Sequence, residues 1–174
     1  LCRQIILFNP SKLVCVDISE YNLFSLKNEL LNYKNKNNLN IEFAFYLVSI
    51  NNYHQMENIF NKNNINIVLH AAAYKHVELI ENNIISAIET NIFGFKNILE
   101  LSLKNKINKF LFVSTDKAVR PKSIMGYTKR FAEIYLQYLN KKNNHSTKLG
   151  VVRFGNVFGS AGSVIELFNR QIQN

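Results

Sequence analysis

The chain has 174 residues, of which 47% are hydrophobic, and this composition suits one folded domain and argues against disorder. Its formal net charge is +9, but Lys and Asn are scattered through every loop, as AT-biased coding would produce, and aromatic residues do not alternate with the basic ones. Nucleic-acid binding is therefore not predicted.

No apolar run approaches the roughly 20 residues that cross a membrane, and no secretion signal is recognisable, so we expect a soluble, cytoplasmic chain. Cys2 and Cys15 fit a reducing compartment and match no metal spacing, so no metal site is predicted.

Short β-branched runs alternate with longer helical patterns along the chain, and this alternation predicts an α/β fold with a parallel sheet and crossover helices. The predicted strands, several of them apolar on both faces, are residues 13–18, 41–48, 67–72, 110–114 and 149–154. The predicted helices are residues 20–33, 53–61, 84–104, 126–140 and 164–173. Residues 1–8 have the pattern of a helix end that turns into a strand, and the C-terminus stops inside a helical pattern, so we expect an excerpt of a larger protein.

Several predicted strands end in residues that could contact a ligand, because open α/β sheets bind ligands at the carboxyl ends of their strands. Asp17 could accept hydrogen bonds from the ribose of a dinucleotide, or it could only cap the following helix. Lys75 could contact a ligand or lie in a solvated loop. Three small residues, which would let a flat ligand or a helix approach the backbone, follow His70: Ala71, Ala72 and Ala73.

The fourth predicted strand ends in a hydroxyl, a carboxylate and an ammonium group, carried by Thr115, Asp116 and Lys117. Neighbouring residues in an extended chain point to opposite sides, so Asp116 and Lys117 could meet one substrate only if the backbone bends there. A solvated polar strand end is the alternative. Eight residues further on, Met125 and Lys129 are four residues apart and would share one helix face.

The last predicted strand closes with Arg153 and Asn156 and leads into a Gly/Ser-rich turn before a helix. The N–H groups of such a turn, together with these two side chains, could bind a pyrophosphate. A flexible connector with Ser163 as the helix cap is the alternative.

Taken in order, these segments resemble the CapD- and WbpM-type polysaccharide-biosynthesis proteins, which are extended short-chain dehydrogenases that act as UDP-N-acetylglucosamine 4,6-dehydratases. The resemblance implies a Rossmann-type doubly wound parallel sheet. Residues 1–174 would be a partial NAD(P)-binding domain that lacks the first strand and the Gly-rich loop and ends where the substrate-binding region begins. The matching segments cover nearly the whole chain: LCRQI (1–5), HAAAYKHV (70–77), Thr90-Asn91 with Gly94, STDKAV (114–119), Met125-Gly126 with Thr128-Lys129-Arg130, and RFGNV (153–157).

The resemblance also implies a mechanism, in which hydride leaves C4 of the sugar for NAD or NADP and later returns at C6. Lys117 would remove the C5 proton, and Asp116 would protonate the departing C6 hydroxyl. Thr115 would lie near the C4 oxygen, and Lys129 on the nicotinamide ribose. The residues implied to line the cofactor are Asp17, Ser49, Ile50, Ala71, Ala72, Ala73, Lys129 and Val157. Those implied to bind the UDP-sugar are Lys75, Arg153 and Asn156.

Met125 stands where most relatives carry the Tyr that takes the C4 hydroxyl proton. Met is usual at this place in the larger, membrane-anchored branch of the family, so the resemblance implies that branch and leaves Asp116 or a relayed water as the base. It also implies a homo-oligomer and membrane contact only through segments outside this sequence. The alternatives are a UDP-sugar 4-epimerase on the same fold and a non-catalytic fragment.

Overall fold

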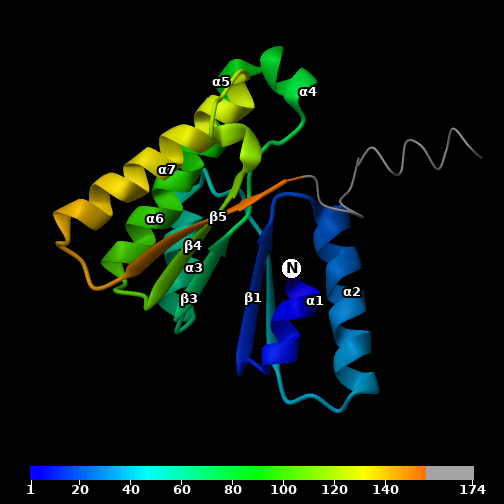
Figure 1. Ribbon diagram of the computed structural model, residues 1–174. Coiled ribbons are helices and arrows are strands. Elements are labelled where there is room, and N and C mark those ends of the chain that lie inside the picture. Colours follow the sequence, from blue (N-terminus) through cyan, green and yellow to red (C-terminus); the bar gives the residue numbers. More distant parts are fainter. Residues whose placement is uncertain (156–174) are drawn as a thin grey trace, which may run out of the picture.

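The structure is a computed structural model that describes residues 1–155, and Figure 1 shows strands flanked by helices throughout this part. Asn156, Val157 and the predicted helix at 164–173 lie outside the described residues. The elements in chain order are α1 (Cys2–Ile5), a 3-10 turn (Ile6–Phe8), β1 (Lys12–Asp17), α2 (Glu20–Lys36), β2 (Glu42–Leu47), α3 (Tyr53–Lys62), β3 (Ile67–His70), α4 (Val77–Glu81), α5 (Ile84–Ile88), a π-helical stretch (Glu89–Gly94), α6 (Phe95–Lys104), β4 (Lys109–Thr115), a 3-10 turn (Asp116–Ala118), α7 (Ile124–Lys142) and β5 (Lys148–Phe154).

The predicted strands are all present, and the four predicted helices that fall within residues 1–155 are present as well. The helix predicted at 84–104 is helical throughout, but residues Glu89–Gly94 within it adopt a π-helical turn. The sequence patterns missed α4, a helix of only five residues whose Ile80 is buried. No helix within residues 1–155 has the length and hydropathy needed to cross a membrane.

The strands form two parallel sheets, so the α/β class with parallel strands is confirmed. One sheet contains β1 and β2, and the other has the order β3-β4-β5. Among residues 1–155, β1 pairs with β2 alone and β3 pairs with β4 alone, and Figure 1 shows the two sheets standing apart. That the complete sheet has a further strand stays a prediction.

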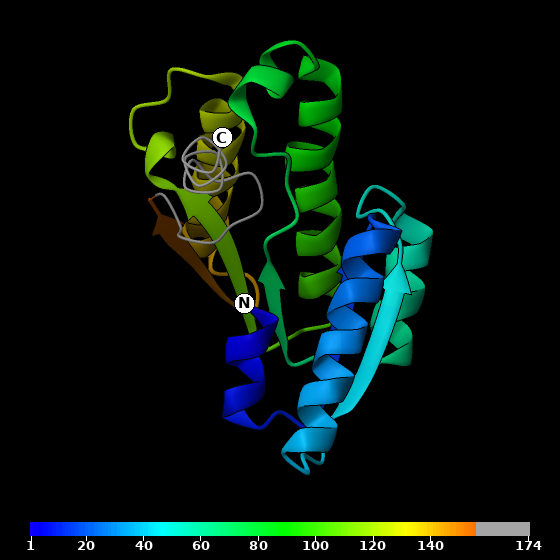
Figure 2. The same cartoon turned by 90° about the vertical axis from the view of Figure 1, so that its right-hand side faces the viewer.

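One apolar core joins the two sheets. Its centre is formed by Phe95 of α6 with Phe110 and Phe112 of β4, all fully buried, and Val14 of β1 packs against the same cluster. Helix α2 packs on β1 and β2, while α6 and α7 pack on the three-stranded sheet. Figure 2 shows the strand arrows running in one direction, so the carboxyl ends that carry the predicted site residues gather at one edge of the molecule.

Candidate active site

The end of β4 bends sharply, as the predicted pairing of Asp116 with Lys117 requires. Residues Asp116–Ala118 form a 3-10 turn, in which the Lys117 amide donates to Thr115 Oγ1 at 3.4 Å. The Thr115 hydroxyl donates in turn to Asp116 Oδ1 at 2.9 Å. Lys117 Nζ lies 3.2 Å from the same carboxylate oxygen. The turn therefore brings a hydroxyl, a carboxylate and an ammonium group together at the surface.

The charge on Asp116 is favoured by its neighbours. The hydrogen bond from Thr115 and then that from Lys117 hold the pKa of Asp116 below its usual value, so the carboxyl group is anionic at neutral pH. An anionic carboxylate is a proton acceptor. The general-acid role predicted for Asp116 therefore requires that it first takes up a proton.

Helix α7 packs directly against this turn. Ser123 caps the helix, its hydroxyl accepting from the Gly126 amide at 3.2 Å. A Cβ atom at Gly126 would lie only 2.8 Å from the Lys117 carbonyl oxygen, so a residue without a side chain is needed for this approach.

Met125 is 5% exposed and packs with Ile80 and Ala87 in a separate apolar cluster. Its thioether has no proton to exchange, which fits the prediction that another group takes the C4 hydroxyl proton.

Lys129 lies one turn further along α7 and is 7% exposed. Its Nζ donates to the Val113 carbonyl of β4 at 2.9 Å and lies 4.7 Å from the centre of the Phe112 ring. Burial lowers the pKa of Lys129 to about 8. Because an ammonium group has three donors, a contact to a ribose hydroxyl is compatible with the bond to Val113.

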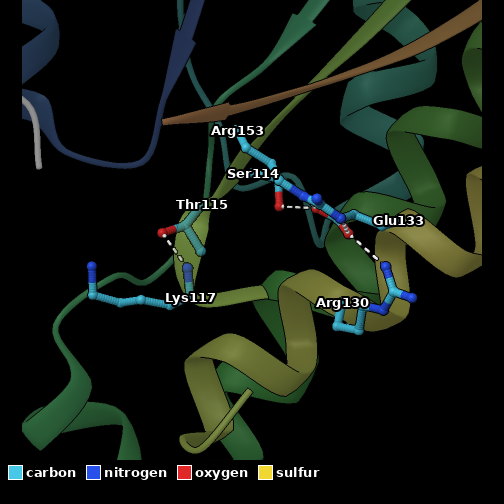
Figure 3. Close-up of polar contacts among 6 residues, drawn as sticks. All are labelled: Ser114, Thr115, Lys117, Arg130, Glu133 and Arg153. Carbon is cyan, nitrogen blue, oxygen red and sulfur yellow. Dashed lines mark hydrogen bonds and ion pairs between the residues drawn. The ribbon is translucent and has the colours of Figure 1, made fainter. Parts of the chain in front are cut away.

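Glu133, one turn beyond Lys129, was not predicted as a site residue. It is 1% exposed and accepts hydrogen bonds from Ser114 Oγ at 2.7 Å, from Arg153 Nε at 2.8 Å and Nη2 at 2.7 Å, and from Arg130 Nη1 at 3.2 Å (Figure 3). Burial raises its pKa, but the hydrogen bonds from Arg153, Ser114 and Arg130 outweigh this effect and lower the pKa to about 2. Its sequence signal is an acidic residue four positions after Lys129, on the same face of α7 as the buried Ala132 and Leu136.

Three of the predicted cofactor residues, Asp17, Ser49 and Ile50, lie at or just after the ends of β1 and β2. Asp17 Oδ1 accepts from the Ser19 amide at 2.8 Å, but the cap of α2 is Ser19 itself, whose hydroxyl accepts from the Asn22 amide at 3.3 Å. The loop that holds Ser49 and Ile50 is fixed by Asn97, whose amide nitrogen donates to the Ile50 carbonyl at 3.2 Å. A Cβ atom at Gly94 would lie 2.6 Å from the Ile50 side chain, so the π-helical turn and this loop are in close contact.

The loop after β3 is tied to α7 by Asn91, which is 2% exposed. Its side chain accepts from the Tyr74 amide at 2.8 Å and donates to the Tyr74 carbonyl and to Thr128 Oγ1, both at 3.1 Å. This leaves Ala71 and Ala72 exposed at the strand end, and Lys75 exposed beyond them. Asn156 and Val157 lie outside the described residues.

Sequence comparison identifies the relatives of the chain. A profile of the family described as "Polysaccharide biosynthesis protein" matches residues 1–174. The capsular polysaccharide biosynthesis protein CapD of Staphylococcus aureus is 42% identical over 100% of this chain and 28% of its own length. The UDP-N-acetylglucosamine 4,6-dehydratase (inverting) of Campylobacter jejuni is 39% identical over 62% of the chain and 33% of its own length. The UDP-glucose 4-epimerase of Rickettsia canadensis is 38% identical over 77% of the chain and 39% of its own length.

Solved structures share the fold. The X-ray structure of Pen from Bacillus thuringiensis has a TM-score of 0.83 at 34% identity and covers 99% of this chain and 51% of its own. The UDP-glucose 4-epimerase of Bifidobacterium longum, solved with NAD⁺ and UDP, has a TM-score of 0.70 at 20% identity over 86% of this chain and 47% of its own, and it supports the predicted Rossmann-type fold alone. The chain thus spans well under two thirds of these proteins. It belongs to the polysaccharide biosynthesis protein family, as its resemblance to the CapD- and WbpM-type proteins predicted.

Proposed function

We propose that the complete protein is an NAD(P)-dependent nucleotide-sugar 4,6-dehydratase that converts UDP-N-acetylglucosamine to a 4-keto-6-deoxy sugar for surface polysaccharide. The observation that carries this proposal is the Asp116–Lys117 pair, 3.2 Å apart at the carboxyl end of β4. Elimination across C5 and C6 needs a base for one proton and an acid for another, and the pair offers both groups at one place. A cytoplasmic catalytic domain, a homo-oligomer and a membrane-anchored parent protein stay predictions.

The described residues fit a dinucleotide. A carboxylate at Asp17 suits the ribose hydroxyls, and the exposed Ala71 and Ala72 leave the end of β3 open to a flat ligand. The acidic group at Asp17 favours NAD over NADP. When bound, the nicotinamide would accept hydride from C4 and return it at C6. Lys129 could donate to the nicotinamide ribose while it keeps its bond to Val113.

The proton steps follow from the charges in the turn. Asp116 begins as an anion and takes the proton of the C4 hydroxyl as the C4–H bond breaks. Lys117 first releases its ammonium proton to solvent and then, as a neutral amine, removes the C5 proton. Asp116 gives its proton to the C6 hydroxyl, which leaves as water, and Lys117 returns its proton to C5. Lys117 then takes a proton back from solvent, so both side chains recover their starting states and the net change is the loss of one water.

Epimerisation at C4 is the second candidate, because a UDP-glucose 4-epimerase is among the relatives. An epimerase needs no acid–base pair for C5 and C6, so the Asp116–Lys117 pair favours the dehydratase. The test is to incubate the full-length protein with UDP-N-acetylglucosamine and NAD. We expect a product lighter by one water, with the absorbance of a 4-keto sugar. A product of unchanged mass with inverted C4 would identify an epimerase instead.

Two variants separate the proposed roles in the turn. We expect Asp116→Asn to form no reduced nicotinamide in a single turnover, because the C4 hydroxyl loses its proton acceptor. We expect Lys117→Met to reduce the nicotinamide but to incorporate no solvent deuterium at C5, with overall turnover about 100-fold or more below wild type. The measurements are nicotinamide absorbance and mass spectrometry in D₂O. An Asp116→Asn enzyme that still oxidises C4 would show that another group takes the C4 hydroxyl proton. For Met125→Tyr we expect unchanged activity, because in this proposal the residue at this position does not take that proton.

A further inference from the structure

Glu133 lies at the centre of a charged network beside the proposed active site and takes no part in the proton steps above. The network joins three elements, since Ser114 belongs to β4, Glu133 and Arg130 to α7, and Arg153 to β5. Figure 3 shows the carboxylate surrounded by these three side chains, while Lys117 extends away from it. The carboxylate itself is buried, whereas the side chains of Arg130 and Arg153 are 36% and 40% exposed.

Stability alone does not account for a charge at this place. Removing a carboxylate from water costs free energy, and apolar residues of similar size often stabilise a fold equally well or better. Arg130 and Arg153 could also be solvated without Glu133, because both are partly exposed. What the carboxylate does supply is fixed geometry, since the bidentate bond from Arg153 defines both distance and angle.

The hydrogen bonds of Lys129 and Glu133 indicate that α7 fixes the end of β4. Lys129 and Glu133 are one helical turn apart, and they bind successive residues of β4, namely the carbonyl of Val113 and the hydroxyl of Ser114. The next residue of the strand is Thr115, which caps the 3-10 turn Asp116–Ala118. Helix α7 therefore holds the last residues of β4 at two consecutive points.

The same carboxylate also fixes the end of β5. Ser114 and Arg153 are register partners in the sheet, and both donate to Glu133. Two residues beyond Arg153, a Cβ atom at Gly155 would lie 4.0 Å from Asp116 Oδ2. The end of β5 is thus adjacent to the proposed proton acceptor, and any shift between the strands would change the surroundings of Asp116.

We propose that Glu133 is a positioning residue of this active site: its carboxylate fixes the ends of β4 and β5 against α7 and so holds the Asp116–Lys117 pair where it meets the sugar. This inference rests on the proposed dehydratase function. Under this inference, the main role of Arg153 is to form the ion pair with Glu133. The substrate contact predicted for Arg153 is compatible with this role, since the ion pair uses Nε and Nη2.

The test compares three variants of the full-length protein. Glu133→Gln keeps the shape and removes the charge. The double variant Glu133→Met/Ser114→Ala replaces the buried polar pair with apolar groups and leaves Arg153 in place. Glu100→Gln is the matched control, because it removes the same charge from an exposed ion pair with Lys96 on α6. For each, kcat and KM for the nucleotide sugar, the Tm, and hydrogen–deuterium exchange of the peptide that contains residues 115–118 are measured.

We expect kcat to fall about 10- to 100-fold in both Glu133 variants, with a smaller change in KM, because the reacting groups are displaced while substrate contacts remain. Exchange in residues 115–118 should be faster than in wild type. The double variant should keep a Tm within a few degrees of wild type, and Glu100→Gln should match wild type throughout. Wild-type kcat and exchange in the double variant would overturn the inference, because the network would then be replaceable by any well-packed group.

The two proposals fail in different ways. If the wild-type protein yields no 4-keto-6-deoxy product, the proposed function is wrong, whereas the exchange rates of residues 115–118 still report whether Glu133 fixes the turn. If the wild type is active and Glu133→Gln has both wild-type kcat and wild-type exchange, the positioning role is wrong and the function stands.

Discussion

Lys129 shows how one buried charge is linked to stability. Burial lowers its pKa to about 8 from the ordinary lysine value of 10.5, so between these pH values the unfolded chain binds more protons than the folded chain. The free energy of unfolding therefore rises with pH across this window, and below pH 8 the full cost of the buried ammonium group is present. The shift corresponds to about 3 kcal/mol.

Lys129→Met should therefore stabilise the fold at pH 7. We expect a gain of about 2 kcal/mol, because loss of the hydrogen bond to the Val113 carbonyl offsets part of the shift. The advantage over wild type should shrink as the pH rises from 8 to 10.5. Urea unfolding of both proteins at pH 7 and pH 10 measures this difference. If the free energies of unfolding of variant and wild type differed by the same amount at both pH values, burial would not lower the pKa of Lys129.

At the scale of elements, the approach of α7 to the turn Asp116–Ala118 depends on Gly126. Replacement of a helical Gly by Ala gains up to about 1 kcal/mol from helix propensity. At Gly126, however, the new Cβ would meet the backbone oxygen of Lys117 at 2.8 Å, and either the helix or the turn must move. We expect Gly126→Ala to lower the free energy of unfolding by about 1–3 kcal/mol and to reduce kcat.

Gly94→Ala is the matched comparison, because its Cβ would meet only side-chain atoms, Asn51 Oδ1 and Ile50 Cδ1, at 2.6 Å. Side-chain ends can rotate away, so we expect a smaller loss of stability and a smaller change in kcat than for Gly126→Ala. Thermal unfolding and the dehydratase assay measure both variants. Equal effects at the two glycines would show that the contact with Lys117 has no special importance.

The secondary structure could be read from the sequence except where contacts distant in the chain decide it. The strands and long helices follow from apolar periodicity, which is a local property. The π-helical turn at Glu89–Gly94 does not, because it carries Asn91, which bonds to the loop after β3 and to Thr128, 37 residues away. The five-residue α4 is too short to display a helical period.

At the scale of the whole molecule, the largest apolar cluster of residues 1–155 holds the two sheets together. Phe95 is fully buried, and the centroid of its ring lies 5.0 Å from that of Phe112 and 6.1 Å from that of Phe110. Val14, from the other sheet, packs against the same cluster. Because the core is shared, neither sheet retains its full apolar contacts when the other unfolds.

Phe95→Ala should thus destabilise the molecule as a unit. We expect a loss of about 3–5 kcal/mol, the usual range for removing a buried aromatic side chain. Wild type and variant should each unfold in one transition, with coincident curves from far-UV circular dichroism and tyrosine fluorescence in urea. Two separate transitions in the wild type would show that the sheets are independent.

By itself, the sequence determined the α/β class, the positions of the strands along the chain and the strand ends at which candidate site residues follow, because hydrophobic periodicity and polar strand ends are local features. It also carried the family resemblance, since the matching segments keep their order and spacing. Only the tertiary structure decided that the backbone bends to pair Asp116 with Lys117 and that Met125 is buried. It alone showed that Arg153 pairs with Glu133, 20 residues away. Such pairings depend on how α7 packs against β4 and β5, which no local pattern specifies.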